Sequence, residues 1–299
     1  MKQKIHLLLI LLAFLNCSFT NSQLLKNLTS SYESFSAYYL DDTKTGDFNY
    51  NNRFRSNNYL NIKSNIAKNW NLELQIESYA PNALLNYSPN LKDTGISTFK
   101  FQYTNEKIDL TIGNFYQQFG SGMILRFWED RNLGINNSIR GLNANYRIND
   151  QINITALYGT QKKGFKYSKG YVLGIDTEID VSKIFKNNST LILGLSYVGR
   201  NDNKTTGTTY KNTTNLYSAR LDFSSSSYYS NIEIISKSKD PIMQFEKFSD
   251  NFVKKGSAFL FNTGFIKNGF GIDVTFRRLE NMSIYSERDA FGNTFNESI

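Results

Sequence analysis

The sequence predicts an all-β protein in which about thirteen antiparallel strands follow one another as an up-and-down meander. Three observations lead to this fold class: a hydrophobic leader at the N-terminus, apolar–polar alternation along most of the remaining chain, and a regular succession of short and long connections. Aromatic residues are abundant, with 23 Phe and 19 Tyr, whereas proline occurs only 3 times. Past the leader no apolar run reaches the length of a membrane-spanning helix, so the fold is expected to consist of strands.

The N-terminal residues have the order of charged, apolar and small residues that is typical of a secretory signal peptide. Lys2 and Lys4 precede the apolar run "LLLILLAFL" (7–15), and a small, polar stretch follows it. The run is too short to span a bilayer, which takes roughly 20 residues. We expect cleavage after Ser22, which divides the chain into a signal peptide, 1–22, and a mature domain, 23–299.

Cleavage at that point removes the only cysteine, Cys17, and the only histidine, His6. The mature chain then has no disulfide, no thiol nucleophile and no imidazole, which excludes Ser–His and Cys–His catalysis and histidine-based zinc sites. We therefore expect no catalytic residues, no cofactor and no metal. A lipoprotein anchored at Cys17 is the alternative reading of the leader, but Phe14 and Asn16 fit that cleavage pattern poorly.

The charge balance of the mature chain is mildly basic. Loss of Lys2 and Lys4 reduces the 34 basic residues to 32, against 26 acidic residues, which leaves a net charge of +6. The basic residues are scattered and form no block with interleaved aromatics, so nucleic acid is not an expected partner.

Apolar and polar residues alternate with the period of a β-strand along most of the chain. In "NLELQIES" (71–78), for example, Leu72, Leu74 and Ile76 share one face of the predicted strand, and the polar residues between them share the other. The same reading gives thirteen strands, at about 30–40, 53–67, 70–80, 96–105, 107–116, 138–149, 151–161, 170–182, 189–200, 213–224, 227–238, 255–267 and 269–279.

Short and long connections alternate without exception between these strands. Short turns fall near residues 69, 106, 150, 187, 226 and 268, and the long connections are 41–52, 81–95, 117–137, 161–169, 201–212 and 239–254. Transmembrane barrels have short periplasmic turns and long extracellular loops, whereas Greek-key sandwiches mix the two irregularly. The sequence therefore predicts a β-barrel in the cell outer membrane, surrounded by outer-membrane lipid.

The number of strands is odd, which does not fit a closed barrel of this kind. Bacterial single-chain barrels have an even strand count, and unpaired strand edges are costly in lipid. The chain ends "FGNTFNESI", with no further alternating strand after about residue 279. We therefore expect an incomplete barrel whose C-terminal strands are missing.

One segment interrupts the alternation: "GNFYQQFGSGMILRFWEDRNLGINNSIRG", residues 113–141, is rich in glycine, aromatics and charge. It resembles the signature of an uncharacterised Bacteroidota outer-membrane family, a domain of unknown function, and "FRRLENMSIYSERDAFGN" (276–293) resembles a second stretch of that family. The resemblance extends from about Gln23 to the end of the chain. It implies a barrel of the cell envelope and no reaction, ligand or binding residue.

The charges of this segment are the candidate site. They are Arg126, Glu129, Asp130, Arg131 and Arg140. If the segment folds into the barrel, these residues form a pore constriction, as charged rings do in selective channels. If it stays above the rim, they pair with one another and anchor an ordered loop or a docking surface.

The sequence leaves three functions open. The first is a porin-like passive channel for small polar solutes. The second is a non-transporting barrel that acts as an accessory subunit, with protein partners in an envelope assembly or secretion complex. The third is a soluble exported β-protein that binds glycans.

Overall fold

A computed structural model of the chain describes residues 27–44, 46, 53–84, 90, 91, 93–185, 189–202, 210–244, 247–287, 294 and 296. The predicted signal peptide, 1–22, lies outside these residues. Within the part of the chain that is described, no helix combines the length and the apolar character needed to cross a membrane.

In the described part of the chain, thirteen strands follow one another in one antiparallel sheet, each paired with the next along the meander. They are β1 (Leu28–Tyr38), β2 (Phe54–Ala67), β3 (Trp70–Ser78), β4 (Thr94–Thr104), β5 (Ile108–Phe115), β10 (Ile139–Asn149), β11 (Ile152–Lys163), β13 (Tyr171–Asp180), β14 (Thr190–Asn201), β15 (Thr213–Ser224), β16 (Tyr228–Gln244), β17 (Lys247–Lys267) and β18 (Phe270–Glu280). The short strand β12 (Lys166–Tyr167) pairs with the end of β11, and a 3₁₀ turn, η2 (Ser182–Ile184), joins β13 to β14.

The predicted meander is confirmed, and its strand bounds agree with the observed ones to within a few residues, except at the sixth long connection. The expectation of a long loop at 239–254 is wrong, because β16 continues to Gln244 and β17 begins again at Lys247. The pairing of these two strands shifts register between Lys237 and Asp240 and again between Pro241 and Met243. A proline has no N–H to donate to a ladder, and such irregular positions are where strands accommodate it.

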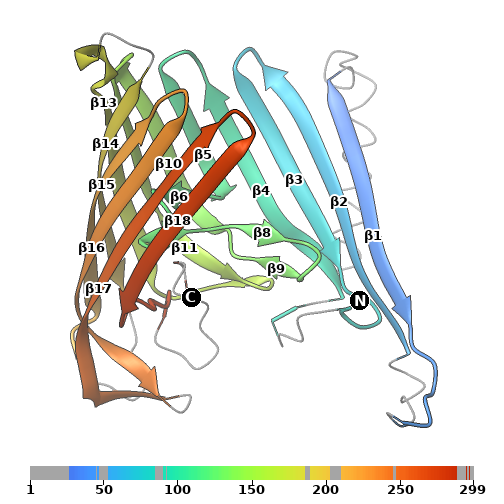
Figure 1. The fold of residues 1–299 in the computed structure, drawn as a ribbon. Helices are drawn as coiled ribbons and strands as arrows, with labels where there is room; N and C mark the ends of the chain where they lie inside the picture. Colours follow the sequence, from blue (N-terminus) through green and yellow to red (C-terminus); the bar gives the residue numbers. More distant parts are fainter. Residues whose placement is uncertain are drawn as a thin grey trace.

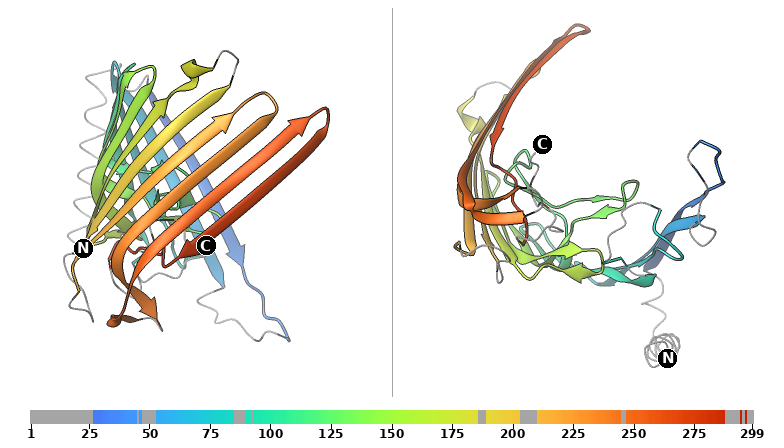
Figure 2. Two further views of the ribbon diagram at one scale, coloured as in Figure 1. Left: turned by 60° about the vertical axis from the view of Figure 1, so that its left-hand side comes forward. Right: turned by 90° about the horizontal axis from the view of Figure 1, so that it is seen from below.

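The short and long connections lie at opposite rims of the sheet (Figure 1). The tight turns that join β2 to β3, β4 to β5 and β17 to β18 are together at the top of that view, and the end of β1 and the start of β2 lie at the bottom. Seen along the strands, the sheet is a curved, open wall (Figure 2). Its two edges are β1 and β18, which run in the same direction because an even number of antiparallel steps separates them.

The two faces of the wall are the reverse of those in a soluble protein. Large apolar side chains stand exposed on the convex face of nearly every strand, among them Leu72, Ile96, Ile112, Leu142, Leu195, Ile234 and Ile272. Polar side chains are buried on the concave face, among them Gln75, Thr111, Thr155, Asp176, Ser196, Ser218, Arg220 and Glu233. Exposed apolar surface on this scale is characteristic of a face that meets lipid.

The connection between β5 and β10, residues 116–138, lies on the concave side of the sheet (Figure 2). We refer to it as the inner segment. It contains two small hairpins, β6 (Gln118–Phe119) with β7 (Leu125–Arg126) and β8 (Glu129–Asp130) with β9 (Ile135–Asn136).

The first half of the inner segment is the centre of the apolar core. Phe119, Met123, Ile124, Leu125 and Phe127 are buried in it. They pack on apolar side chains that project from the concave face of β11 and β13–β17, namely Leu157, Val172, Val198, Leu216, Ile235 and Ala258. Met282 and Ile284, which follow β18, join the same cluster.

Candidate functional site: a polar recess on the concave face

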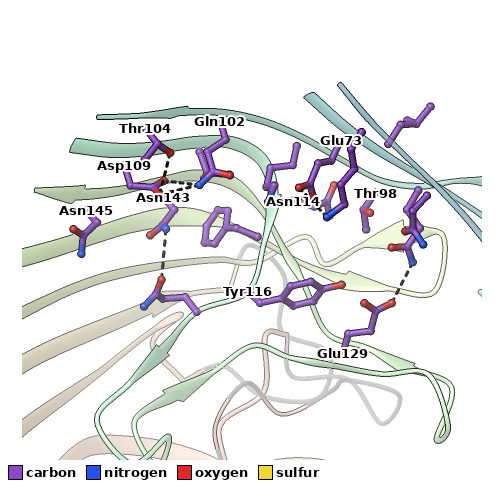
Figure 3. Close-up of a pocket in the computed structure, with 18 of the residues that line it drawn as sticks. Glu73, Thr98, Gln102, Thr104, Asp109, Asn114, Tyr116, Glu129, Asn143 and Asn145 are labelled. Atoms are coloured by element: carbon purple, nitrogen blue, oxygen red, sulfur yellow. Dashed lines mark hydrogen bonds and ion pairs between the residues drawn. The ribbon is translucent and has the colours of Figure 1, made fainter. Parts of the chain in front are cut away.

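A recess of about 850 Å³ lies on the concave side between the inner segment and strands β1–β5 and β10. Figure 3 shows Glu73, Gln102, Asp109, Asn143 and other side chains from these strands facing Tyr116 and Glu129 of the inner segment. The volume lies within the range of small-molecule sites, about 300–1,000 Å³.

The strand pattern determines which residues line the recess. Alternate residues of an antiparallel strand point to one face, so the polar half of each strand faces the recess and the apolar half lies on the convex face. The lining contains five carboxylates (Glu33, Glu73, Glu106, Asp109 and Glu129) and five cations (Lys63, Lys100, Lys107, Arg131 and Arg147), so its formal charge is balanced.

The charges on the wall of the recess are paired across neighbouring strands. Glu73 on β3 lies 3.2 Å from Lys63 on β2 and 3.2 Å from Lys100 on β4. Asp109 on β5 accepts hydrogen bonds from Gln102 Nε2 at 2.8 and 2.9 Å and from Thr104 at 3.2 Å. Glu73 lies directly opposite both lysines and Asp109 lies directly opposite Thr104, whereas Gln102 is a diagonal neighbour of Asp109. Both kinds of cross-strand pair stabilise a sheet.

Arg131 joins the inner segment to the first strands of the sheet. Its Nη1 lies 2.7 Å from Glu33 Oε2 on β1, and its Nε lies 3.4 Å from Glu129 Oε1. It also donates to Asn61 Oδ1 at 3.4 Å and lies over the ring of Tyr59, 4.9 Å from the ring centre. The planar, five-donor guanidinium suits such a junction, because it can pair with several acceptors at once.

Glu129 is the acidic centre of the same junction. Its Oε1 accepts hydrogen bonds from Gln75 at 3.1 Å and from Asn136 at 3.3 Å. Desolvation in the recess, followed by the negative charges of Glu129 and Glu77, raises the pKa of the Tyr116 hydroxyl. Tyr116 therefore remains a neutral donor at any physiological pH.

A buried ion pair fixes the inner segment on the side of the long connections. Glu77 at the end of β3 and Lys162 at the end of β11 are 0% and 1% exposed, and Glu77 Oε2 lies 3.6 Å from Lys162 Nζ. Glu77 also accepts hydrogen bonds from Gln75 at 2.8 Å, Tyr79 at 2.8 Å and Asn136 at 3.5 Å. The carboxylate thus connects two distant strands and β9 of the inner segment.

The opposite end of the inner segment is attached to β15 and β16. Ser121 donates both its backbone N–H, at 3.0 Å, and its hydroxyl to Glu233 Oε2. Gly120 adopts a φ of +52°, and a Cβ there would lie 2.8 Å from Glu233. Arg220 beside it is held by Asp176 at 2.7 and 2.9 Å and by Glu178 at 2.8 Å. The inner segment therefore crosses the concave side from β1–β3 to β16.

The residues that follow β18 also return to the concave face. Arg200 on β14 donates to the carbonyl of Tyr285 at 3.2 Å, and Lys237 on β16 donates to the carbonyl of Ser283 at 2.9 Å. Glu287 forms an ion pair with Lys163. This half of the concave side is consequently filled, whereas the half at β1–β5 and β10 contains the recess.

The structure brings together two of the five residues predicted as a site. Glu129 and Arg131 line the recess and contact each other. Asp130 accepts a hydrogen bond from the backbone N–H of Leu133 at 3.1 Å and so closes the turn after β8. Arg126 lies over Trp128, and Arg140 is exposed and lies 4.0 Å from the ring centre of Tyr167. These three residues do not line the recess.

The sequence reading did not select most of the residues that form this site. Glu33, Asn61, Gln75, Gln102 and Asn143 are polar residues of ordinary alternating strands, and nothing in their spacing separates them from other polar positions. The alternation places these residues on the polar face of their strands. It therefore predicts that they point inward together with all other residues of that face, but it does not single them out. Among the described residues, no group of three or more His, Cys, Asp or Glu side chains is placed to hold a metal ion.

The fold and the recess together define a class of protein. It is an antiparallel β-meander curved into an open barrel wall, with an apolar convex face, a polar concave face and a connection folded across the interior. A family model described as a family of unknown function (DUF6029) matches residues 1–299, and the chain belongs to this family. No curated protein matches the sequence significantly.

Solved structures with a similar arrangement include outer-membrane proteins. The chain matches the outer membrane protein OpdK of Pseudomonas aeruginosa at 14% identity, over 90% of this chain and 74% of that one, with a TM-score of 0.49. It matches OmpF of Salmonella typhi, solved with daunomycin, at 12% identity over 88% and 95% of the two chains, with a TM-score of 0.37. OmpT of Vibrio cholerae matches at 8% identity over 92% and 96%, with a TM-score of 0.35. At these sequence identities and TM-scores the similar structures carry no argument about the fold, so the fold assignment depends on the strand pairing of the chain itself.

Proposed function

We propose that the chain forms the wall of an outer-membrane β-barrel through which small polar solutes pass passively, without catalysis. The observation that carries this proposal is the reversed arrangement of the sheet, with exposed apolar side chains on the convex face and a polar recess on the concave face. Lipid stabilises the first surface and water the second. The predicted signal peptide, 1–22, would direct export to this membrane.

In this proposal the inner segment forms the constriction. Glu129 and Arg131 define its charged edge, because they project into the recess and are held there by Gln75 and Glu33. Arg126, Asp130 and Arg140 act as loop anchors instead, through ring contacts and the turn after β8.

The proposal requires a closed wall, because unpaired backbone groups at the edges of β1 and β18 are costly in lipid. These two strands run in the same direction. An antiparallel closure therefore needs an odd number of additional strands between them. The functional experiments apply to this closed form.

Ion flux through lipid vesicles or planar bilayers tests the proposal. With balanced charge in the recess, a reversal at the constriction should dominate selectivity, so Glu129→Lys is expected to shift the reversal potential towards anions. The matched control is Asp42→Lys, in the connection after β1, which should leave selectivity unchanged. Deletion of residues 129–136, which removes the β8–β9 hairpin and leaves the apolar core in place, should raise conductance. No conductance in the closed barrel, with or without the deletion, would contradict the proposal.

A second function, that of a non-transporting accessory subunit of an envelope complex, is favoured by the filled half of the concave side. The apolar cluster around Phe119 and Leu125 and the buried Arg200–Asp240 pair, 2.9 Å apart, occupy the concave side of β13–β17. Absence of flux, together with co-purification of a defined envelope protein, would favour this function. The exposed apolar convex face does not suit the third possibility, a soluble glycan-binding protein.

A further inference from the structure

Neutral hydrogen-bonding side chains are slightly more numerous in the lining of the recess than charged ones. Eight of its residues are Asn or Gln and four are Ser or Thr. An amide presents both a donor and an acceptor, and a hydroxyl does the same. A surface of this composition can satisfy a ligand whose polar groups also donate and accept.

Six of the ten charged residues of the recess are already paired with one another. Glu73 is shared between Lys63 and Lys100, and Arg131 is shared between Glu33 and Glu129. A charged solute would have to compete with an existing partner at each of these positions. Glu106, Lys107 and Arg147 are exposed near the short turns, where salt screens their charges.

Two groups in the recess have capacity for a ligand. The Oδ1 atom of Asn143 is buried and accepts no hydrogen bond from the described residues, and its amide nitrogen donates to Gln117 only at 3.5 Å. A buried acceptor without a donor is unfavourable unless another group satisfies it. Tyr116 is 41% exposed, and its ring lies on the opposite side of the recess from the strands (Figure 3).

We propose that the recess binds a neutral polyhydroxylated solute, a mono- or disaccharide, in preference to a charged one; this inference deepens the proposed function and rests on it. Hydroxyl groups of the sugar satisfy the amides, including Asn143 Oδ1 once this side chain turns towards the ligand, and the apolar C–H face of the sugar packs on the ring of Tyr116. No ion pair of the recess has to open for such a ligand to bind.

Calorimetric titration of the whole chain in micelles of a sugar-free detergent tests this inference with maltose, glutamate and lysine as probes. We expect maltose to bind more tightly than either charged probe. Its affinity should not change between about 0.05 and 0.5 M NaCl, because a neutral ligand has no charge to screen. Asn143→Leu and Tyr116→Ala should each weaken maltose binding roughly tenfold, the change expected for loss of about one good contact.

Asn262→Leu, on β17 and outside the recess, is the matched control and should leave the affinity for maltose unchanged. Equal or tighter binding of glutamate or lysine, or maltose binding that neither recess variant weakens, would overturn the inference. The result is separable from the proposed function: flux without sugar binding contradicts only the inference, whereas sugar binding in a closed barrel without flux contradicts only passive passage.

Discussion

Lys162→Met breaks the buried ion pair between β3 and β11. The surroundings of this pair in the structure indicate how much free energy of unfolding the substitution removes. The substitution retains the length of the side chain but leaves the Glu77 carboxylate, 0% exposed, without its cation. Breaking a buried pair by removing one partner costs about 3–5 kcal/mol. Glu77 keeps three neutral donors, on Gln75, Tyr79 and Asn136, so we expect the lower end of that range, about 3 kcal/mol.

Denaturant unfolding in detergent, followed by the fluorescence of Trp70 and Trp128, measures this loss. The double variant Glu77→Gln with Lys162→Met replaces both charges and should cost only about 1 kcal/mol, which gives a coupling of about 2 kcal/mol or more. Lys107→Met, in an exposed turn, is the control and should change stability by less than about 0.5 kcal/mol. The single variants Lys162→Met and Glu77→Gln complete the comparison. If each of them lowered the free energy of unfolding by less than about 0.5 kcal/mol and the two effects added, the reasoning would be refuted, because water would then reach the pair.

Three further outcomes are expected. Ile154→Arg, on the convex face of β11, should destabilise the protein in lipid by roughly 2–4 kcal/mol, whereas Asn153→Arg, on the concave face, should be far milder; equal losses in refolding assays would contradict the assignment of faces. Arg131→Met should release β8 and β9 from β1, so limited proteolysis should cut the inner segment faster, and an unchanged rate would mean that Arg131 does not hold it. A cysteine at Asn251 should be labelled from outside intact cells and one at Ser226 should not; the reverse result would invert the orientation.

The strands were predictable from sequence because their convex faces carry mostly apolar side chains and their concave faces carry mostly polar ones. A period of two then persists along the thirteen strands except at the end of β16, and glycine, asparagine and serine mark the short turns. The end of the β16–β17 hairpin was not predictable in this way. "KDPIMQFEK" (239–247) contains Pro241 and no alternation, and its strand character depends on backbone pairing across a register shift.

The position of the inner segment depends on contacts that a local reading cannot provide. Ser121 meets Glu233, 112 residues away, and Arg131 meets Glu33 on the first strand. The sequence identified the segment as unusual and named its charges, but it did not distinguish a loop folded inward from one above the rim. For the same reason it could not separate Glu129 and Arg131 from the neighbouring Asp130.

The measurement that tests the central claim most directly is a cysteine scan of β10 in lipid vesicles. Single cysteines at 142–147, each carrying an environment-sensitive fluorophore, should alternate. Labels at Leu142, Ala144 and Tyr146 are expected to be quenched by nitroxide lipids, and those at the three intervening positions by aqueous iodide. A sheet buried on both faces would instead protect all six labels from iodide, and a reversed phase would place the polar recess against lipid; either result would contradict the account.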